Sequence, residues 1–238
     1  MKNPFRSFTK FEYGLWLFSL VGVVISFALS LYFGETINHI SIISFIISAM
    51  GVTALVFNAK GMVEGQVLSV IFSLLYGYVS FHQRYYGEMI TYMGMTMPIA
   101  AASVYTWLRN PDGDSGEVKI KIMRKRDYAL TAVLTILVTI SFYFILKALG
   151  TSSLIAGTFS VTTSFSASYL TMMRCPLYAV CYSANDIILI FLWTVATVKD
   201  ISNLPMVICF IMFLFNDIYG FISWKRRLRK QIEEATKS

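Results

Sequence analysis

Hydrophobic residues fill long stretches of this chain, and polar residues collect in the short segments between them. Eight stretches are long enough to cross the hydrocarbon core of a bilayer, which takes about 20 helical residues. They are residues 12–33, 39–58, 62–81, 87–108, 128–149, 153–172, 176–198 and 203–224. The strict alternation of a membrane-crossing strand is almost absent, so the pattern predicts eight transmembrane helices.

Three prolines and the first stretch refine this prediction. Pro176 and Pro205 stand at the start of the last two stretches, where a missing N–H costs no helical hydrogen bond. Pro98 lies inside the fourth stretch and predicts a kink there. The first stretch begins near Phe11 and is longer than the apolar core of a signal peptide, so we expect it to remain as a helix.

Composition and charge agree with a membrane protein. Hydrophobic residues make up 56% of the chain and charged residues 14%, with a mean hydropathy of +0.64, whereas soluble domains carry about 25% charged residues. The net charge of +7 forms no single face, so we expect no nucleic-acid partner. With the N-terminus inside, 17 of the 20 Lys and Arg residues fall on the cytoplasmic side, and Arg84, Lys147 and Lys199 remain near the outer edge. This bias predicts that both termini are cytoplasmic.

Two parts of the sequence resemble each other and indicate an internal repeat. "SVYTWLRN" ends the fourth stretch, and "GFISWKRR" ends the eighth, 117 residues later. Trp107 and Trp224 take the same place before the basic exit, where an interfacial indole belongs. "GVTALVF" (51–57) also resembles "SVTTSFS" (160–166), at an offset of 109. Such parallel repeats form one known transporter plan, with the substrate held between the repeats near the membrane midplane.

The repeat divides the chain into six parts. They are an extra N-terminal helix (1–34), a first three-helix repeat (35–108), a cytoplasmic loop (109–127), a linker helix (128–150), a second three-helix repeat (151–226) and a basic cytoplasmic tail (227–238).

Polar side chains recur at helical spacing within two of the stretches. The third stretch carries Gln66, Ser69, Ser73, Tyr76 and Ser80 on one face, and the sixth carries Thr158, Thr162, Ser166 and Tyr169. Stripes of Ser and Thr also mark contacts between membrane helices, so both interpretations stay open for these hydroxyls.

Amide and carboxyl side chains inside apolar stretches are the stronger signal, because such groups seldom face lipid and usually line a bundle interior or a cavity. The doublet Asn-Asp occurs twice, at 185–186 and at 216–217, and its Asn residues suit either binding or helix packing. Nearby Tyr and Trp rings favour a ligand with hydroxyls and a flat or cationic ring. The predicted substrate-binding residues are Gln66, Tyr76, Glu88, Tyr92, Tyr178, Tyr182, Asn185, Asp186, Trp193, Asn216 and Asp217.

No catalytic residue, metal site or cofactor is predicted. The sequence has no H-E-x-x-H, G-x-S-x-G or ATP-binding loop, and its three cysteines (Cys175, Cys181 and Cys209) form no C-x-x-C pair. An intramembrane aspartyl enzyme using Asp186 and Asp217 is an alternative, although neither lies in the sequence context usual for that chemistry. A receptor or scaffold is another, but the segment 109–127 is too short for an effector domain.

The "NDIYGFISWKRR" ending, the polar seventh stretch and the two three-helix units with a linker helix resemble the PnuC family of bacterial vitamin transporters, over roughly residues 39–226. The resemblance implies an all-α, SWEET-like fold and a homotrimer in the bacterial cytoplasmic membrane. It implies import of nicotinamide riboside, a form of vitamin B3 used in NAD biosynthesis. It also implies facilitated diffusion, with a cytoplasmic kinase that traps the entering vitamin.

One family motif is only partly retained. The family pattern W-x-x-W-x-x-x-N lines the nucleoside site, and here Asn185 keeps the last position while Tyr178 and Cys181 replace the tryptophans. Because a cysteine cannot stack on a ring, thiamine, riboflavin and deoxynucleosides are alternative substrates. Proton coupling through Glu88, Asp186 or Asp217 is an alternative mechanism.

Overall fold

The computed structural model describes residues 4–33, 39–82, 86–113, 116–150, 153–199 and 204–237. A short 3-10 turn, η1 (Pro4–Ser7), precedes the first long helix, and a π-helical turn, η2 (Tyr92–Thr96), joins α4 to α5. The α-helices are α1 (Lys10–Tyr32), α2 (His39–Lys60), α3 (Val63–His82), α4 (Tyr86–Thr91), α5 (Met97–Leu108), α6 (Lys125–Ala148), α7 (Leu154–Met172), α8 (Tyr178–Lys199) and α9 (Leu204–Lys237). With α4, η2 and α5 taken as one interrupted helix, the eight predicted helices are confirmed.

The predictions for Pro98 and Pro205 are confirmed, whereas Pro176 lies two residues before the start of its helix. The interruption expected near Pro98 is present as η2, because proline lacks an N–H and its ring crowds the carbonyl four residues earlier. Pro205 is the second residue of α9. Pro176 does not open its helix, since it lies in a turn and α8 begins two residues later, at Tyr178.

Among the described residues, five helices are long and apolar enough to cross a membrane by length and composition alone. They are Lys10–Tyr32, Ile42–Lys60, Lys125–Ala148, Tyr178–Val195 and Met206–Thr236, and Val63–Val79 forms a shorter apolar helix. The other predicted crossings differ from these in two ways: η2 divides the fourth, and α7 is rich in Ser and Thr.

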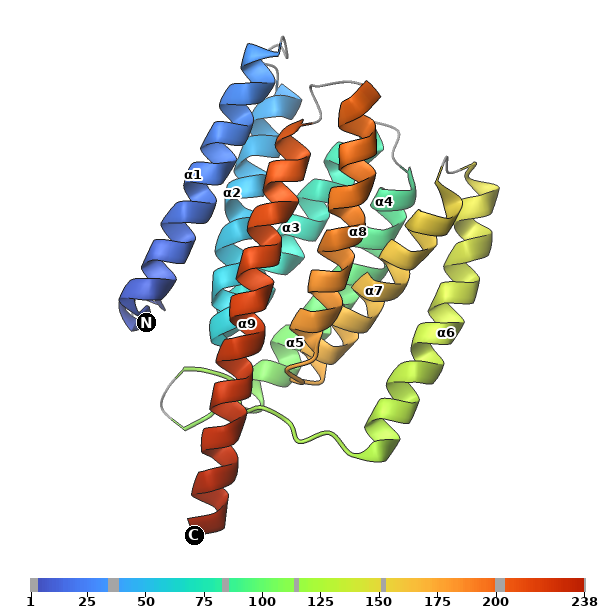
Figure 1. Ribbon diagram of the computed structural model, residues 1–238. Coiled ribbons are helices and arrows are strands. Elements are labelled where there is room, and N and C mark those ends of the chain that lie inside the picture. Colours follow the sequence, from blue (N-terminus) through green and yellow to red (C-terminus); the bar gives the residue numbers. More distant parts are fainter. Residues whose placement is uncertain are drawn as a thin grey trace.

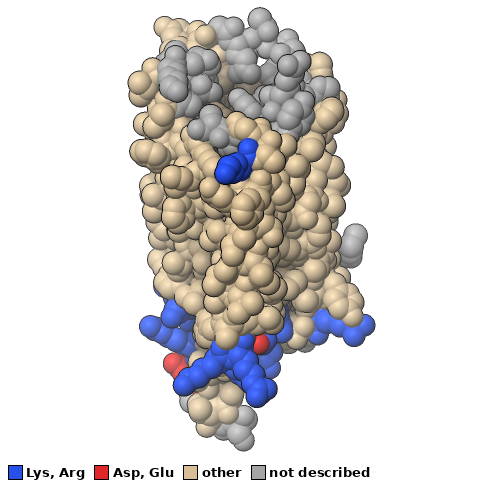
Figure 2. Space-filling view, turned by 90° about the vertical axis from the view of Figure 1, so that its right-hand side faces the viewer, with Lys and Arg blue, Asp and Glu red and all other residues tan. Residues whose placement is uncertain are grey.

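Both termini lie at the same end of the bundle, the lower end in Figure 1. Lys and Arg side chains gather at this end on the face that Figure 2 presents, which is otherwise almost free of charge. We call it the basic end. This arrangement agrees with the even number of crossings predicted from the distribution of basic residues. Arg84 and the side chains of Ser80 and Lys199 lie outside the described residues.

Some contacts between helices are similar in the two predicted three-helix units. Neighbours pack as α2 on α3 and as α7 on α8, while α2 contacts α9 and α5 contacts α7 across the centre (Figure 1). In the predicted repeats, the first helix of each unit therefore contacts the third helix of the other. The extra helix α1 packs on α2 and α9, and α6 packs mainly on α7.

Equivalent capping turns end α2 and α7. Gly61 (φ +81°) and Arg174 (φ 58°) both adopt the left-handed conformation. The Gly61 N–H donates to Asn58 O at 2.9 Å, and the Arg174 N–H donates to Thr171 O at 2.9 Å. These turns are 113 residues apart, a separation between the offsets of 109 and 117 noted in the sequence, and the repeat stays a prediction.

Trp107 and Trp224 lock this end of the bundle reciprocally. The indole of Trp107 donates to Thr171 O at 3.0 Å, and that of Trp224 donates to Asn58 O at 3.0 Å. Their ring centroids are 5.5 Å apart, and the residues are 1% and 0% exposed. The expected interfacial position is therefore wrong for both. The indoles find backbone carbonyl partners inside the protein, so they need no contact with the membrane interface.

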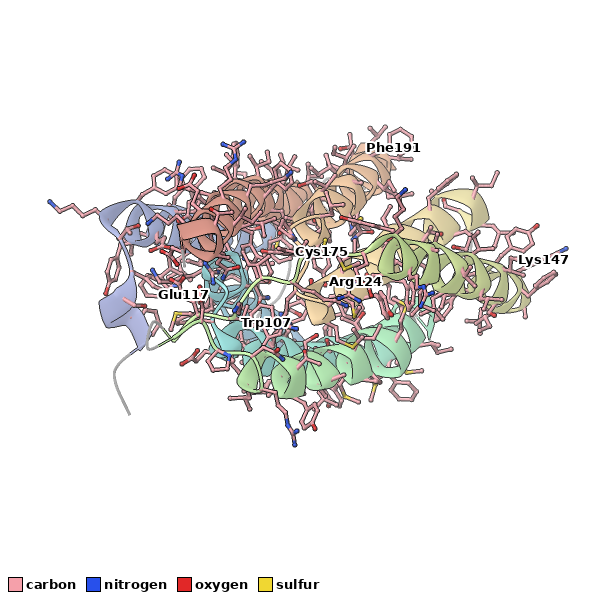
Figure 3. All side chains as sticks on the ribbon, turned by 90° about the horizontal axis from the view of Figure 1, so that it is seen from below. Trp107, Glu117, Arg124, Lys147, Cys175 and Phe191 are labelled. Atoms are coloured by element: carbon pink, nitrogen blue, oxygen red, sulfur yellow. The ribbon has the colours of Figure 1, made fainter. Side chains whose placement is uncertain are left out.

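The segment 117–121, which we call the strap, crosses beneath the helices at the basic end (Figure 3). Val118 and Ile120 are buried, at 1% and 4% exposure, in a cluster with both tryptophans. The Val118 N–H donates to Gly61 O at 2.8 Å, and the Lys121 N–H donates to Arg174 O at 3.1 Å. The strap is thus bound to both capping turns and closes the bundle at this end.

Arg227 of α9 fastens the strap to the helices. Its guanidinium forms an ion pair with Glu117 at 2.9 Å and donates to Val118 O at 2.6 Å and to Lys60 O at 2.9 Å. Gly61 leaves room for this side chain, because a Cβ there would collide with the guanidinium.

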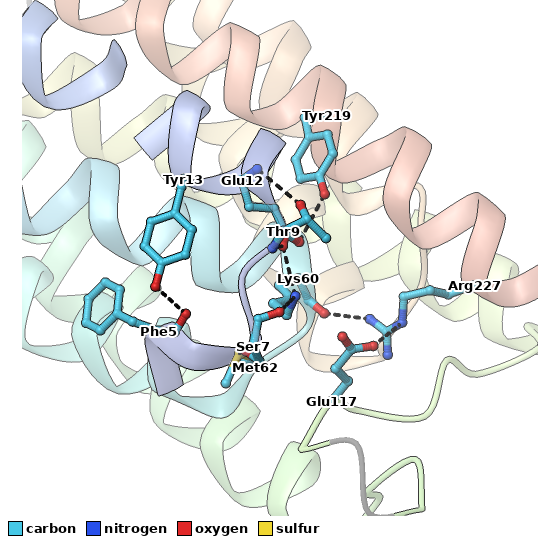
Figure 4. A network of polar contacts seen from close by, with 10 residues as sticks. All are labelled: Phe5, Ser7, Thr9, Glu12, Tyr13, Lys60, Met62, Glu117, Tyr219 and Arg227. Atoms are coloured by element: carbon cyan, nitrogen blue, oxygen red, sulfur yellow. Dashed lines mark hydrogen bonds and ion pairs between the residues drawn. The ribbon is translucent and has the colours of Figure 1, made fainter. Parts of the chain in front are cut away.

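A second polar network anchors η1 and α1 (Figure 4). The carboxylate of Glu12 accepts from Lys60 Nζ at 2.9 Å, from the Thr9 N–H at 2.6 Å and from the Tyr219 hydroxyl at 3.0 Å. Lys60 Nζ also donates to Ser7 O at 2.6 Å. The network joins α1 to α2 and α9.

The Ser/Thr stripe of the sixth predicted helix serves packing in part. Thr162 of α7 lies 2.8 Å from the Thr139 hydroxyl of α6, and Ser166 lies 3.1 Å from the Thr135 hydroxyl. These hydroxyls join α7 to α6, as small polar side chains do between membrane helices.

Candidate substrate site

The carboxyl groups of the two Asn-Asp doublets meet at the centre of the second repeat. Asp186 of α8 and Asp217 of α9 are in side-chain hydrogen-bond contact with each other. They are 3% and 4% exposed. Since two carboxylates repel each other, this contact requires a proton on at least one of the two groups. We call Asp186 and Asp217 the carboxyl pair.

The two Asn residues point to other helices. The side-chain oxygen of Asn185 accepts from Ser160 at 2.9 Å and from Thr163 at 3.1 Å, both in α7. The amide nitrogen of Asn216 donates to the Ser19 hydroxyl of α1 at 2.8 Å. Successive residues of a helix differ by about 100° in direction, so each doublet divides between a neighbouring helix and the carboxyl pair.

Tyrosines from both repeats surround the carboxyl pair. The Tyr182 hydroxyl lies 3.0 Å from that of Ser168 in α7 and interacts electrostatically with both carboxyls. Tyr92 of η2 interacts with Asp186 and Tyr182. The π-helical turn thus brings a ring of the first repeat within electrostatic range of Asp186.

The first repeat adds a further group of polar residues. The rings of Tyr76 and Tyr92 lie 4.4 Å apart between centroids. The hydroxyl of Tyr76 is 3.5 Å from a Glu88 carboxyl oxygen, at the limit of a hydrogen bond. Cys209 of α9 interacts with both tyrosines and with Asp186. Polar groups therefore continue from Glu88 to the carboxyl pair.

Gln66 and Tyr178 lie toward the basic end, although Tyr178 also interacts with Asp217 and its ring centroid is 6.2 Å from that of Tyr182. The amide of Gln66 donates to the Asn58 side chain at 2.7 Å, and the hydroxyl of Tyr178 is 3.3 Å from Asn58 O. Tyr178 also packs on Trp224, with centroids 4.8 Å apart. Trp193 is seven residues beyond Asp186 along α8, about two turns away. The predicted residues that the structure brings together are Tyr76, Glu88, Tyr92, Tyr178, Tyr182, Asp186 and Asp217.

Among the described residues, acidic groups but no basic groups act on the carboxyl pair. Among the described residues, the charged group acting on each carboxyl is the other carboxyl, and no Lys or Arg contributes. The Oδ2 atom of Asp186 is buried without a hydrogen-bond partner. The described part of the chain also contains no cluster of three His, Cys, Asp or Glu residues suited to a metal ion.

Cys209 and Asn58 are important residues that sequence reasoning missed. Cys209 is eight residues before Asp217, a spacing that places both on roughly the same face of α9. Asn58 was visible as the single amide near the end of an apolar stretch, and its contacts join α2 to α3, α8 and α9.

A groove of about 910 Å³ lies between α6, α7 and α8, away from the carboxyl pair. It is lined by apolar side chains such as Phe159, Ile187 and Phe191, which are exposed. Ile187 follows Asp186 in sequence but points out of the bundle. Tyr143 and Ser153 bring hydroxyl groups to a lining that is otherwise apolar, so the groove offers few hydrogen bonds to a hydroxylated ligand.

Long apolar helices around a continuous group of buried polar side chains define a multi-pass membrane protein of the solute-transporter class. A family model described as nicotinamide mononucleotide transporter matches residues 41–226, so the chain belongs to that family. The PnuC resemblance noted in the sequence is thereby confirmed.

Two relatives are named nicotinamide riboside transporter PnuC. The protein from Neisseria mucosa is 26% identical over 234 residues, covering 96% of this chain and 86% of the relative. The protein from Haemophilus influenzae is 24% identical over 183 residues, covering 76% and 77%. A crystal structure of the vitamin B3 transporter PnuC matches with a TM-score of 0.76 at 24% identity, over 94% of each chain, and shows the shared fold.

Proposed function

We propose that this chain imports nicotinamide riboside across the bacterial cytoplasmic membrane. Support comes from the family, from the substrate in the names of two relatives, and from the polar groups around Asp186 and Asp217. Tyr76, Tyr92 and Tyr182 offer ring faces and hydroxyls, and Glu88 and the carboxyl pair offer hydrogen-bond acceptors for the ribose. The other predicted binding residues, Gln66, Tyr178, Asn185, Trp193 and Asn216, stay predictions.

The observation that favours the riboside over the mononucleotide is that no basic residue among those described acts on the carboxyl pair. A phosphate group carries about two negative charges and is recognised by Arg, Lys or helix N-termini. Among the described residues, neither aspartate of the carboxyl pair has a basic neighbour. A phosphate buried beside these carboxyls would lose its hydration without a basic group among the described residues to compensate it.

The proposed mechanism is facilitated diffusion, with trapping by a cytoplasmic kinase. The sequence has no ATP-binding loop that would drive uptake. The six-part division read from the sequence, with its two parallel repeats, and a SWEET-like homotrimeric assembly belong to the same proposal. Both termini and the strap then face the cytoplasm, as the basic residues favour. In this orientation the strap lies across the cytoplasmic end of the bundle.

A binding experiment tests the substrate. Calorimetry on the purified protein with nicotinamide riboside, its mononucleotide, thiamine, riboflavin and deoxynucleosides should show one clear ligand, the riboside. A matching thermal shift is expected, because a ligand of the folded state raises apparent stability. Binding of thiamine, riboflavin or a deoxynucleoside without the riboside would replace the named substrate. Binding of the mononucleotide as tightly as the riboside would contradict the charge argument.

The protein is proposed not to be an enzyme. Two neighbouring Asp side chains on two helices also occur in aspartyl chemistry, where the carboxyls share one proton. Incubation of the purified protein with membrane-peptide substrates should yield no cleavage. Cleavage that an Asp186→Asn variant abolishes would contradict this proposal.

A further inference from the structure

A second groove lies on the surface of α9 at the basic end. Its volume is about 400 Å³, and it is lined by Phe221, Ile222, Lys225, Arg226 and Arg229. The basic residues follow Ile222 at three, four and seven positions, a spacing that keeps them on one face of the helix. We call these five residues the basic groove. Its volume lies within the range of about 300–1,000 Å³ that is typical of small-molecule sites.

The length of α9 places the basic groove at the edge of the membrane. The helix has 34 residues, whereas about 20 helical residues span the hydrocarbon core. α9 accordingly continues below the other helices (Figure 1). A count from Leu204 places the apolar members of the groove, Phe221 and Ile222, just inside the hydrocarbon boundary. The three basic residues follow just beyond it, at the level of the lipid headgroups.

The basic side chains of the groove are not neutralised by the protein. All three are exposed, and among the described residues no ion pair includes any of them. Lys225 instead lies over the ring of Phe221, with its Nζ 5.6 Å from the ring centroid. The acidic residues that form ion pairs at this end have other partners: Glu12 with Lys60, Asp127 with Lys121 and Glu117 with Arg227.

The arrangement goes beyond what membrane orientation requires. The excess of basic residues on the cytoplasmic side would account for Lys and Arg on any side of this helix. Here Arg227 points the other way, into the strap, where Glu117 neutralises it. The three residues that remain unpaired border one groove, and two apolar side chains form its membrane side.

We propose that the basic groove binds an anionic phospholipid, whose phosphate lies between the three basic side chains and whose acyl chain lies along Phe221 and Ile222. Guanidinium groups present paired donors that match phosphate oxygens, and Lys225 adds a compact charge. A soluble anion would leave the two apolar side chains without a partner. A zwitterionic phospholipid would bring a positive charge of its own beside three others. The inference depends on the position of α9 in the membrane and not on which vitamin the protein carries.

Native mass spectrometry on the full-length protein in a neutral detergent tests the proposal. The probes are phosphatidylglycerol and phosphatidylcholine with identical acyl chains. Each Lys or Arg near anionic headgroups strengthens binding about fivefold. With three such residues, we expect phosphatidylglycerol to bind at least about tenfold more tightly than phosphatidylcholine. Equal affinity for the two lipids overturns the proposal.

The Lys225→Gln/Arg226→Gln/Arg229→Gln variant tests the residues themselves. Its preference for phosphatidylglycerol should fall to within about twofold of none. If this variant does not fold, Arg229→Gln alone, in the exposed part of α9, should lower the preference about fivefold. An unchanged preference in whichever variant is measured overturns the assignment.

A matched control separates the groove from the general positive charge of the basic end. Lys119→Gln/Lys125→Gln/Arg126→Gln removes three exposed charges of the strap and the first turn of α6, outside the groove. It should keep the wild-type preference. Equal losses in the control and in the groove variant would show attraction to the whole end, and would overturn the proposed site.

Soluble phosphates separate a lipid from its headgroup alone. Glycerol phosphate and inorganic phosphate carry the charge but have no acyl chain to contact Phe221 and Ile222. Neither should displace bound phosphatidylglycerol at an equal concentration. Displacement by either would show that the apolar side of the groove contributes nothing, and would overturn the choice of a phospholipid.

Discussion

The ion pair between Glu12 and Lys60 yields a sharp prediction about how the extra helix α1 is held. The two side chains are 4% and 8% exposed, and the distance from Lys60 Nζ to the Glu12 carboxylate is 2.9 Å. The pair connects the first turn of α1 to the end of α2 (Figure 4). Glu12→Gln and Lys60→Met each remove one charge with little change in volume, and each leaves the other charge buried.

The expected magnitude follows from burial. An ion pair this enclosed is hardly screened by solvent, and removing one partner of a buried pair typically costs about 3–5 kcal/mol. The Lys60 ammonium would keep the Ser7 carbonyl as acceptor, and the Glu12 carboxylate would keep Thr9 and Tyr219 as donors. We therefore expect each single variant to lose about 3 kcal/mol, at the low end of that range.

The assay is reversible denaturant unfolding in detergent on both single variants and the double variant. The double variant removes both charges, so its loss should be smaller than the sum of the single losses, with a coupling of about 2 kcal/mol. Lys121→Met is the control. Its partner is Asp127, the two side chains are 31% and 20% exposed, and we expect a loss of at most about 1 kcal/mol. Additive losses, or single losses no larger than that of the control, would refute the reasoning.

Three further predictions concern packing and the strap. Gly65→Ala should lower the free energy of unfolding, because the new Cβ would collide with the Asn58 side chain of α2. Gly14→Ala is the control: its new Cβ would meet open space, so the same unfolding assay should show a neutral or stabilising change. Asn185→Leu should cost about 1–2 kcal/mol of stability through lost contacts with α7; unchanged stability with lost substrate affinity would instead assign it to binding. Burial raises the pKa of the Cys175 thiol, which packs in the same cluster as the strap, so maleimide labelling of Cys175 should be slow at pH 7. Arg227→Met loosens the strap and should make the labelling faster. Mass spectrometry of the modified peptide measures both rates.

The helices were predictable because their physical requirement is local. A segment that crosses a bilayer must be apolar over about 20 residues and must satisfy its own backbone, whatever its neighbours are. The residues between the helices were also informative, since basic residues mark one side of the membrane. The predicted bounds therefore differ little from those of α1, α2 and α6.

The direction of individual side chains was much less predictable. A helix that is apolar on all sides does not reveal which face meets lipid and which meets protein. Asn185 and Asp186 looked alike in sequence, yet one contacts α7 and the other meets Asp217. The burial of Trp107 and Trp224 depends on carbonyl partners more than 60 residues away, and the strap lies in a segment predicted only as a cytoplasmic loop.

Uptake into proteoliposomes tests the central claim most directly. Liposomes containing only this protein should take up labelled nicotinamide riboside until the inside and outside concentrations are equal, and should exclude the mononucleotide. Uptake no faster than in protein-free liposomes would contradict transport of this substrate. Accumulation above the outside concentration, with no gradient and no kinase present, would contradict facilitated diffusion.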